Sequence, residues 1–237
     1  MIPLKANVPT RRLPLATGGL IVAAALWWLL AQGGVAGRPD GLERDSLRRG
    51  VIPARLAHPS RALPRARDAT APWLTPFTAA LLSASIVQLA FNALALWNLG
   101  PCVEEALGAV RTLALVLLSA LASAALLALV APGVHAPLIG AAGACSGLFG
   151  AAFALRPRLK VVSLGLVPGF ATTFEMPGAV WLALWAAAQC AFAALDLTDP
   201  LGGGGAAAWL VWPGGLLAGL ALGRPLARTA RATGRVR

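Results

Sequence analysis

Charged residues are scarce in this sequence. Only 12% of its 237 residues are Asp, Glu, Lys or Arg, whereas 58% are hydrophobic. A soluble domain carries about 25% charged residues, so a soluble fold of this size would lack the polar side chains to cover its surface. The scarcity of charge therefore excludes an ordinary soluble protein. It indicates a single integral membrane domain, with the lipid bilayer as its first partner.

Histidine and cysteine are also few. The sequence contains two histidines, His58 and His135, and three cysteines, Cys102, Cys145 and Cys190. Because the histidines are far apart and the cysteines are scattered, we predict no metal site and no cofactor. The cysteines are odd in number and each lies in or beside an apolar run, which argues against a disulfide framework.

The net charge of +11 comes from Lys and Arg in the tails and in the loops between apolar runs. No nucleic-acid motif and no interleaving of aromatic residues accompanies them, so nucleic acid is not a predicted partner. We interpret these basic residues as determinants of membrane topology that contact anionic lipid headgroups.

Six apolar segments run through the chain, each close to the ~20 residues that a membrane-spanning helix needs. None contains an Asp, Glu, Lys or Arg, and their length favours helices over strands. They cover residues 15–32, 74–98, 112–131, 137–155, 177–195 and 205–223. The first could also be a signal peptide, but no clear cleavage site follows it, so we predict a retained helix. The predicted fold class is an all-α membrane protein with six transmembrane helices.

The loop charges predict the orientation of these helices. Lys and Arg occur in the N-terminal tail (1–14), after the second and fourth segments, and in the C-terminal tail (224–237), whereas the loops after the third and fifth segments have none. The positive-inside rule then places both tails in the cytoplasm. We expect the membrane that holds the domain 15–223 to be a bacterial inner membrane. The first loop (33–72) carries eight arginines and four acids. We expect it to lie in the membrane interface; the alternative is a disordered basic linker.

Three stretches carry a more specific signal. The first reads S-A-S-I-V-Q-L-A-F-N-A-L-A-L-W-N-L-G at 83–100, followed by V-E-E-A-L-G at 103–108. The second reads G-A-A-G-A-C-S-G at 140–147, and the third reads W-L-V-W-P-G-G-L-L-A-G at 209–219. In this order and spacing they resemble the rhomboid family of intramembrane serine proteases. The resemblance implies a six-helix bundle with a water-filled cavity open to the outside. Substrates would reach that cavity between helices two and five.

The same resemblance implies that the catalytic dyad is missing. Rhomboids use a serine at the start of helix four and a histidine on helix six. In this sequence the serine position is Ala142, which has no nucleophile, and the histidine position is Trp212, whose indole nitrogen donates but cannot accept a proton. We expect Trp212 to fill the space that the histidine would occupy beside Ala142.

Two amides fall at positions that the family uses to stabilise the oxyanion. Gln88 stands where the family has a histidine, and Asn92 is retained, while Ser83 replaces an earlier histidine. Both amides could donate hydrogen bonds into a polar cavity. They could equally bond to the neighbouring backbone or helices.

Small residues on helices four and six are expected to pack the two helices closely, with Ser146 among them. Those on helix four are Gly140, Gly143, Ser146, Gly147 and Gly150, and those on helix six are Gly215, Gly219 and Gly223.

The leading functional hypothesis is a pseudoprotease that binds the transmembrane segments of client membrane proteins. An active protease with displaced residues is the first alternative, in which His135 would serve Ser146 or Cys145. His135 is seven residues before Ala142, roughly 10 Å along a helix axis, which is beyond hydrogen-bond reach. A small transporter is the second alternative, but the apolar segments lack the buried charges typical of transport pathways.

Overall fold

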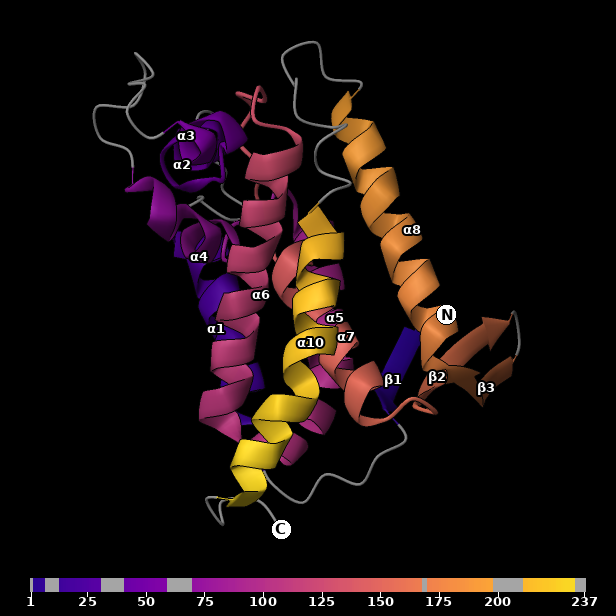
Figure 1. Cartoon of the computed structure of the whole chain (residues 1–237). Coiled ribbons are helices and arrows are strands. Elements are labelled where there is room, and N and C mark those ends of the chain that lie inside the picture. The colour runs from indigo at the N-terminus through magenta and orange to yellow at the C-terminus, as the bar shows by residue number, and fades with distance from the viewer. Residues whose placement is uncertain are drawn as a thin grey trace.

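The computed structural model describes residues 2–6, 13–30, 41–58, 70–167, 170–197 and 211–232. Its long helices stand side by side as a bundle, with shorter elements at the two ends (Figure 1). The long helices are α1 (Leu15–Leu30), α5 (Ile86–Leu107), α6 (Ala109–Val130), α7 (Ala142–Leu155), α8 (Gly178–Leu197) and α10 (Val211–Ala232). The short elements are β1 (Ile2–Ala6), α2 (Gly41–Arg49), α3 (Pro53–Ala57), η2 (Pro72–Leu74), α4 (Thr75–Ala79), β2 (Lys160–Val167) and β3 (Phe170–Pro177).

Two of these helices, α5 and α6, are long and apolar enough to cross a membrane. Three others are apolar but shorter: α1, α7 and the stretch Gly178–Ala191 of α8. The prediction of a mostly helical fold is therefore confirmed, whereas the count of six membrane spans stays a prediction.

The second apolar segment, predicted as one helix over 74–98, is interrupted. A short helix, α4, ends at Ala79, and α5 begins only at Ile86. Ser85 ends the interruption because its hydroxyl accepts a hydrogen bond from the Gln88 amide and so caps α5. The helix then continues through Pro101 to Leu107, so Glu104 lies within α5 and not in the following loop as predicted.

The fold class is not purely helical, which corrects the all-α prediction. Strands β1, β2 and β3 form one antiparallel sheet in that order. Its first strand comes from the segment predicted as an N-terminal tail, and the other two come from the loop predicted after the fourth helix. Pairing these segments gives their backbone amides and carbonyls partners that irregular loops would lack. Strands of eight residues or fewer form no long apolar run, so the pattern that predicted the helices did not reveal them.

Helix α10 also extends beyond its predicted end at residue 223. It continues to Ala232, so the first part of the predicted C-terminal tail is helical. Ala227 and Ala230 in this extension are buried, which keeps an apolar face on the bundle past Arg224.

The described part of the first loop is folded against the bundle. It forms α2 and α3, and Val51, Ile52 and Ala54 between and within them are buried. Val51 pairs with Leu138 of the loop before α7 through two backbone hydrogen bonds. A disordered linker is therefore wrong for residues 41–58, while residues 31–40 and 59–69 lie outside the described ranges. The location of this loop in a membrane interface stays a prediction.

Helix α7 is the centre of the core. Every residue from Gly143 to Ala152 is buried, and α10, α6 and α5 surround it. Phe149 of α7 packs against Trp185 of α8 with 5.1 Å between ring centroids. The central helix is thus the one that begins at the predicted nucleophile position.

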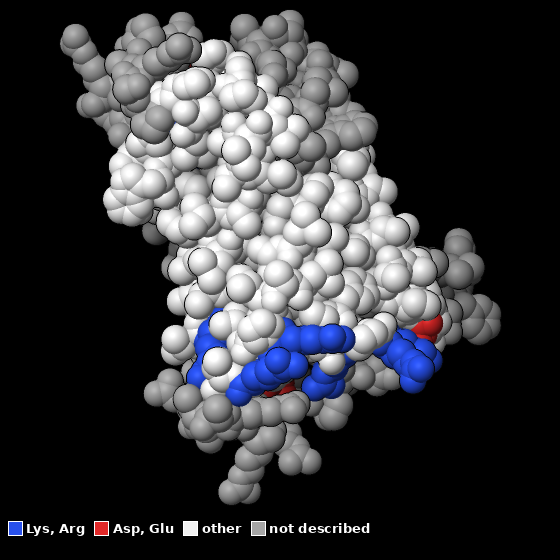
Figure 2. Space-filling model, in the orientation of Figure 1, with Lys and Arg blue, Asp and Glu red and all other residues white. Residues whose placement is uncertain are grey.

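Outside the first loop, the described basic residues gather at one end of the bundle, whereas Arg44, Arg48, Arg49 and Arg55 lie in α2 and α3 at the opposite end (Figure 1). Figure 2 shows a band of Lys and Arg along the former end, and above it a broad flank with no charged side chain on the visible face. Hydrogen bonds tie the helix ends together there: Arg111 donates to the Thr229 carbonyl at 3.1 Å, and Arg224 donates to the Ala154 carbonyl at 2.8 Å. The regions predicted to share one side of the membrane therefore share one end of the molecule.

Candidate functional site at the α7–α10 interface

The position predicted for a nucleophile lies at the first residue of α7. Gly140 precedes it with a φ of +121°, a backbone conformation that favours glycine, and its amide donates to the Ala79 carbonyl at 2.9 Å. This turn directs the chain into a helix that starts at Ala142. A helix N-terminus presents unpaired amides and a partial positive charge, so the location suits an oxyanion. The side chain at that location is only a methyl group.

Helices α7 and α10 approach so closely that their backbones are in contact. A Cβ atom placed on Gly215 would collide with the Gly143 carbonyl, and one placed on Gly219 would collide with the Gly147 carbonyl. On α7, a Cβ atom on Gly150 would collide with the Leu216 carbonyl in the same way. These glycines are therefore required by the spacing of the helices, and no side chain fits between them at these levels.

Trp212 occupies the first turn of α10. Its side chain is partly buried and packs against the main hydrophobic core, as Ala142 does. A Cβ atom on Gly143 would lie 3.4 Å from the Val211 carbonyl. Ala142 directly precedes Gly143 and Trp212 directly follows Val211, so Ala142 and Trp212 lie at the same level of the interface. Among the described residues, the buried Trp212 Nε1 has no hydrogen-bond partner.

Gln88 is used in capping α5. Its side-chain oxygen accepts a hydrogen bond from the Ala84 backbone amide at 2.8 Å, while the Gln88 backbone amide donates to Ser85 Oγ at 3.1 Å. Its Nε2 lies 3.2 Å from the place where a Cβ atom on Gly140 would be. The side chain is therefore next to the turn that leads into α7, with its oxygen occupied by the local backbone.

Asn92 connects α5 to two other helices. It is 3% exposed, and its Oδ1 accepts a hydrogen bond from Gln189 Nε2 of α8 at 2.9 Å. Its backbone carbonyl accepts from the Cys145 thiol of α7 at 3.7 Å. Its Nδ2 is buried and has no partner within the described ranges. Asn92 thus holds α8 through one end of its amide and leaves a donor at the other.

A family model of the Rhomboid domain matches residues 70–229, which is more than half of the chain. The chain belongs to the rhomboid family. The protein is accordingly a rhomboid-fold integral membrane protein. The comparison with curated proteins returned no match.

The side chains considered for a displaced dyad do not meet in this rhomboid. Ser146 is fully buried, and its hydroxyl donates to the Gly143 carbonyl at 2.8 Å. Cys145 is also buried and turns toward Asn92. His135 and His58 are both exposed in loops. Within the described ranges, neither histidine is hydrogen-bonded to Ser146 or Cys145, and the two candidates for a nucleophile each donate to a backbone carbonyl.

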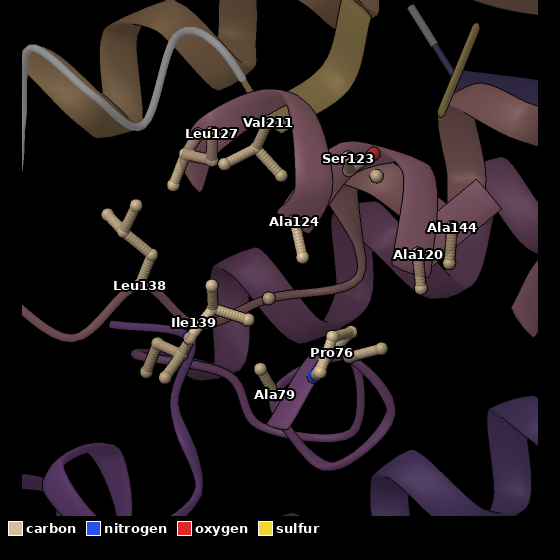
Figure 3. Close-up of a pocket in the computed structure, with 14 residues that line it drawn as sticks. Pro76, Ala79, Ala120, Ser123, Ala124, Leu127, Leu138, Ile139, Ala144 and Val211 are labelled. Atoms are coloured by element: carbon tan, nitrogen blue, oxygen red, sulfur yellow. The ribbon is translucent and has the colours of Figure 1, made fainter. Parts of the chain in front are cut away.

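A small cavity lies beside the start of α7 (Figure 3). Its volume is about 40 Å³, and it is enclosed by the first loop, α4, α6, the loop before α7 and the first residue of α10. Gly140 and Gly143, on either side of Ala142, are part of its wall, and among the described residues that line it Ser123 has the only polar side chain. Such a volume accommodates one or a few water molecules, and it is far too small for a peptide segment.

Glu104 is a structural residue whose role the sequence reasoning missed. Glu104 is 5% exposed, and it lies on α5, which is long and apolar enough to cross a membrane. It accepts hydrogen bonds from the Ala16 amide (2.9 Å), the Thr17 amide (3.0 Å) and the Thr17 hydroxyl (2.8 Å). It therefore caps the N-terminus of α1, where a negative charge is favoured. Glu104 is the first glutamate of the V-E-E-A-L-G stretch at 103–108, so the family-like pattern contained the residue but not its partner.

Proposed function

We propose that this rhomboid is a pseudoprotease, which binds the transmembrane segments of client membrane proteins without cleaving them. The observation that carries the proposal is the simultaneous replacement of both dyad positions by Ala142 and Trp212, at one level of the tight α7–α10 interface. Peptide hydrolysis by this family's chemistry requires a nucleophile and a base that accepts its proton. Neither side chain supplies one.

The surroundings support the same proposal. A replacement nucleophile would have to leave its hydrogen bond and reach an exposed histidine in a loop, since Ser146 is fully buried and bonded to Gly143. The cavity beside Ala142 is small and has apolar walls apart from Ser123. Both features suit a packed interface better than a site that admits water and a peptide.

The binding site for a client helix would be between α5 and α8. Helix α8 contacts the rest of the bundle sparsely, mainly through Trp181, Trp185 and Gln189. A client helix that entered between α5 and α8 would meet Asn92 on one side and Gln189 on the other, and both amides can bond to polar groups within a transmembrane segment. Leu184 of α8 lies next to Trp185 and is exposed, so it is suited to probe this contact.

The membrane topology belongs to the same proposal. We infer six spans in a bacterial inner membrane with both termini in the cytoplasm. The gathering of Arg111, Arg224 and the ends of α7 and α10 at one end of the bundle supports this orientation. Reporter fusions after residue 133 and after residue 232 should report opposite sides of the membrane. The same side for both would contradict the topology.

Catalysis can be tested directly on the purified protein in lipid. The unmodified chain should not cleave a transmembrane substrate and should not react with a fluorophosphonate. The double variant Ala142→Ser, Trp212→His restores the two family residues, and its labelling would show that the fold still supports the chemistry. Cleavage by the unmodified chain, lost in Ser146→Ala, would overturn the proposal and establish an active protease with a displaced nucleophile.

Client binding needs a separate measurement. A photoreactive amino acid at position 184 should crosslink a co-expressed single-span membrane protein. The matched control is the same photoreactive residue at Leu129, which is also exposed but lies at the far end of α6. Equal crosslinking from both positions would show contact with membrane proteins in general and would contradict a specific site between α5 and α8.

A further inference from the structure

The exposed face of α10 changes from apolar to basic along the helix. Leu217 and Leu220 are 61% and 42% exposed, and Ala221, Arg224 and Arg228 farther along are exposed as well. Residues three and four positions apart lie on one face of a helix, so these five residues form one stripe, the α10 stripe. The stripe is continuous because α10 extends past residue 223 to Ala232. It has a hydrocarbon part and a cationic part.

A third arginine joins the basic part of the stripe from another helix. Arg111, in the first turn of α6, donates a hydrogen bond from Nη2 to the Thr229 carbonyl at 3.1 Å. Thr229 directly follows Arg228 in the chain, and Arg224 precedes Arg228 by about one helical turn. The three arginines therefore lie within roughly two helical turns of one another. We call Arg111, Arg224 and Arg228 the arginine cluster.

Two members of the arginine cluster are held in position by carbonyl groups of other helices. Arg224 Nε donates to the Ala154 carbonyl in the last turn of α7 at 2.8 Å, and Arg111 is bonded to α10. A guanidinium has five N–H donors, so one such bond does not use up the group. Arg224 and Arg228 are exposed, and Arg111 is partly exposed. The cluster is thus accessible, and part of the entropy cost of ordering it is already met by these bonds.

The charge of the arginine cluster is not balanced by the protein. Within the described ranges, no carboxylate pairs with Arg224 or Arg228. The carboxylates described at this end of the bundle are Glu104, Glu105 and Glu175, of which the first caps α1 and the third forms a salt bridge within the sheet. Like charges one helical turn apart repel each other. A bound anion would relieve this repulsion.

The arginines at the opposite end of the bundle are arranged differently. Helix α2 carries Glu43 and Asp45 among its three arginines. One of these, Arg49, forms a salt bridge with Asp45 at 2.8 Å and lies over the Trp27 ring at 4.7 Å from its centroid. The protein itself therefore supplies partners for the basic residues there. Arg44 is exposed on the same helix, which makes it a suitable control position.

The apolar part of the α10 stripe indicates which kind of anion fits. Free phosphate or an acidic peptide would contact only the arginine cluster. Leu217 and Leu220 lie farther from the basic end along α10, and Figure 2 shows that the flank above the basic band has no charged side chain on the visible face. In a membrane this flank contacts hydrocarbon, and the basic residues at its edge lie among headgroups. A phosphate that is joined to hydrocarbon chains matches both parts of the stripe.

We propose that the arginine cluster and the α10 stripe bind one anionic phospholipid. Its phosphate lies among the three guanidinium groups, which bind phosphate oxygens through paired N–H···O bonds. One acyl chain follows the stripe along Leu220 and Leu217. This inference does not depend on the loss of proteolysis, because the dyad positions Ala142 and Trp212 belong to neither the cluster nor the stripe.

Native mass spectrometry of the full-length protein in detergent tests the proposal. The probes are dioleoyl phosphatidylglycerol and dioleoyl phosphatidylcholine, added at equal concentration. The anionic lipid should be retained at least about five-fold more than the zwitterionic one, because its net charge offsets that of the cluster. Equal retention of the two lipids would overturn the proposal.

Two soluble competitors test whether the acyl chains matter. Glycerophosphoglycerol has the headgroup of phosphatidylglycerol without its chains, and hexaglutamate represents an acidic peptide. Neither should displace the bound lipid at a concentration equal to that of the lipid. Displacement by glycerophosphoglycerol would assign the cluster to soluble phosphates, and displacement by hexaglutamate would assign it to an acidic protein. Either result would contradict a lipid site.

A substitution at Arg228 locates the contact, because within the described ranges its side chain makes no hydrogen bond that the fold would lose. Arg228→Gln should reduce the retention of phosphatidylglycerol about five-fold, while Arg228→Lys, which keeps the charge, should preserve most of it. Arg44→Gln removes the same charge at the opposite end and should leave the retention unchanged. Equal losses in Arg228→Gln and Arg44→Gln would show a response to net charge alone and would overturn the site. Thermal unfolding of each variant ensures that only folded protein is compared.

Discussion

Helices α10 and α8 are both packed against α7, but in opposite ways. Helix α10 contacts α7 backbone to backbone along the glycines Gly215 and Gly219, so the two helices cannot separate or slide without losing contact over several turns. Among its described side chains, helix α8 contacts the bundle mainly through Trp181, Trp185 and the Gln189–Asn92 amide pair, with Leu182 and Ala186 beside them, and it stands away from the bundle in Figure 1.

An intramembrane protease needs a fixed geometry of its dyad and also a helix that can move aside. In this structure these two properties belong to different helices, α10 and α8. The tight interface keeps the two dyad positions at a fixed level whatever residues they carry. The sparse contacts of α8 leave it as the helix with the lowest cost of displacement. If the proposed function is correct, the tight interface retains the geometry of the dyad positions Ala142 and Trp212, while the sparsely attached α8 is the helix that yields to a client.

The largest effect is expected from one methyl group in the tight interface. In Gly219→Ala the new Cβ atom would collide with the backbone of Gly147 and Ala151, which cannot move aside. We expect a loss of about 3 kcal/mol in the free energy of unfolding, measured by denaturation in mixed micelles. The matched control is Gly19→Ala on α1, where no atom lies within 4 Å. There the same change should stabilise the helix slightly, by about 0.5 kcal/mol. Equal effects in the two variants would contradict the close packing of α7 and α10.

A smaller effect is expected where α1 is held by a single side chain. Glu104→Gln replaces one of the two acceptor oxygens by an amide that faces backbone donors of α1. We expect a loss of about 2 kcal/mol in unfolding free energy, because hydrogen bonds to charged groups are worth about 1.5–3 kcal/mol.

The neighbouring Glu105→Gln is the control for this change in charge. Glu105 is less buried than Glu104, and its substitution should cost less than about 0.5 kcal/mol. Hydrogen exchange at Ala16 and Thr17 gives a second measurement, since their amides should exchange faster only in Glu104→Gln. Unchanged exchange in that variant would show that Glu104 does not cap α1.

The smallest effect is expected at the attachment of α8. A double-mutant cycle with Asn92→Leu and Gln189→Leu should give a coupling energy of about 0.6 kcal/mol, the usual value for an interhelical hydrogen bond in a membrane protein. Thermal unfolding in detergent measures the stabilities, and crosslinking from position 184 should increase in Gln189→Leu if the pair restrains α8. A coupling above about 2 kcal/mol would show that α8 is attached as firmly as α10 and would remove the contrast between them.

The sequence predicted the long helices well because each is a long apolar run, and that pattern requires no knowledge of neighbours. It also identified Gly215 and Gly219 as packing residues from their spacing alone. The sheet was missed because strands β2 and β3 are short and lie between two apolar runs, where charge dominated the interpretation. The break before α5 was missed because a serine such as Ser83 or Ser85 can either cap a helix or stand inside one with its hydroxyl bonded to the backbone.

The site residues were predicted less completely than the fold. Ala142 and Trp212 could be placed from motif order, but the partner of Asn92 could not, because Gln189 is distant in sequence and the two meet only when α8 is folded against α5. Glu104 shows the same limit. Its carboxylate accepts hydrogen bonds only because Thr17 at the start of α1, 87 residues earlier in the chain, lies beside it.

Helices α5 and α6 are joined by Gly108 alone, which has a φ of +80° and serves as the last cap of one helix and the first of the other. Within the described ranges, these are also the two helices that meet the length and hydropathy of a membrane span. Because the connection is one residue long, the two helices are antiparallel neighbours as soon as both have formed. The two helices can therefore enter the bilayer as a preassembled hairpin during synthesis. A substitution at Gly108 would then affect the yield of inserted protein before it affected the stability of the finished fold.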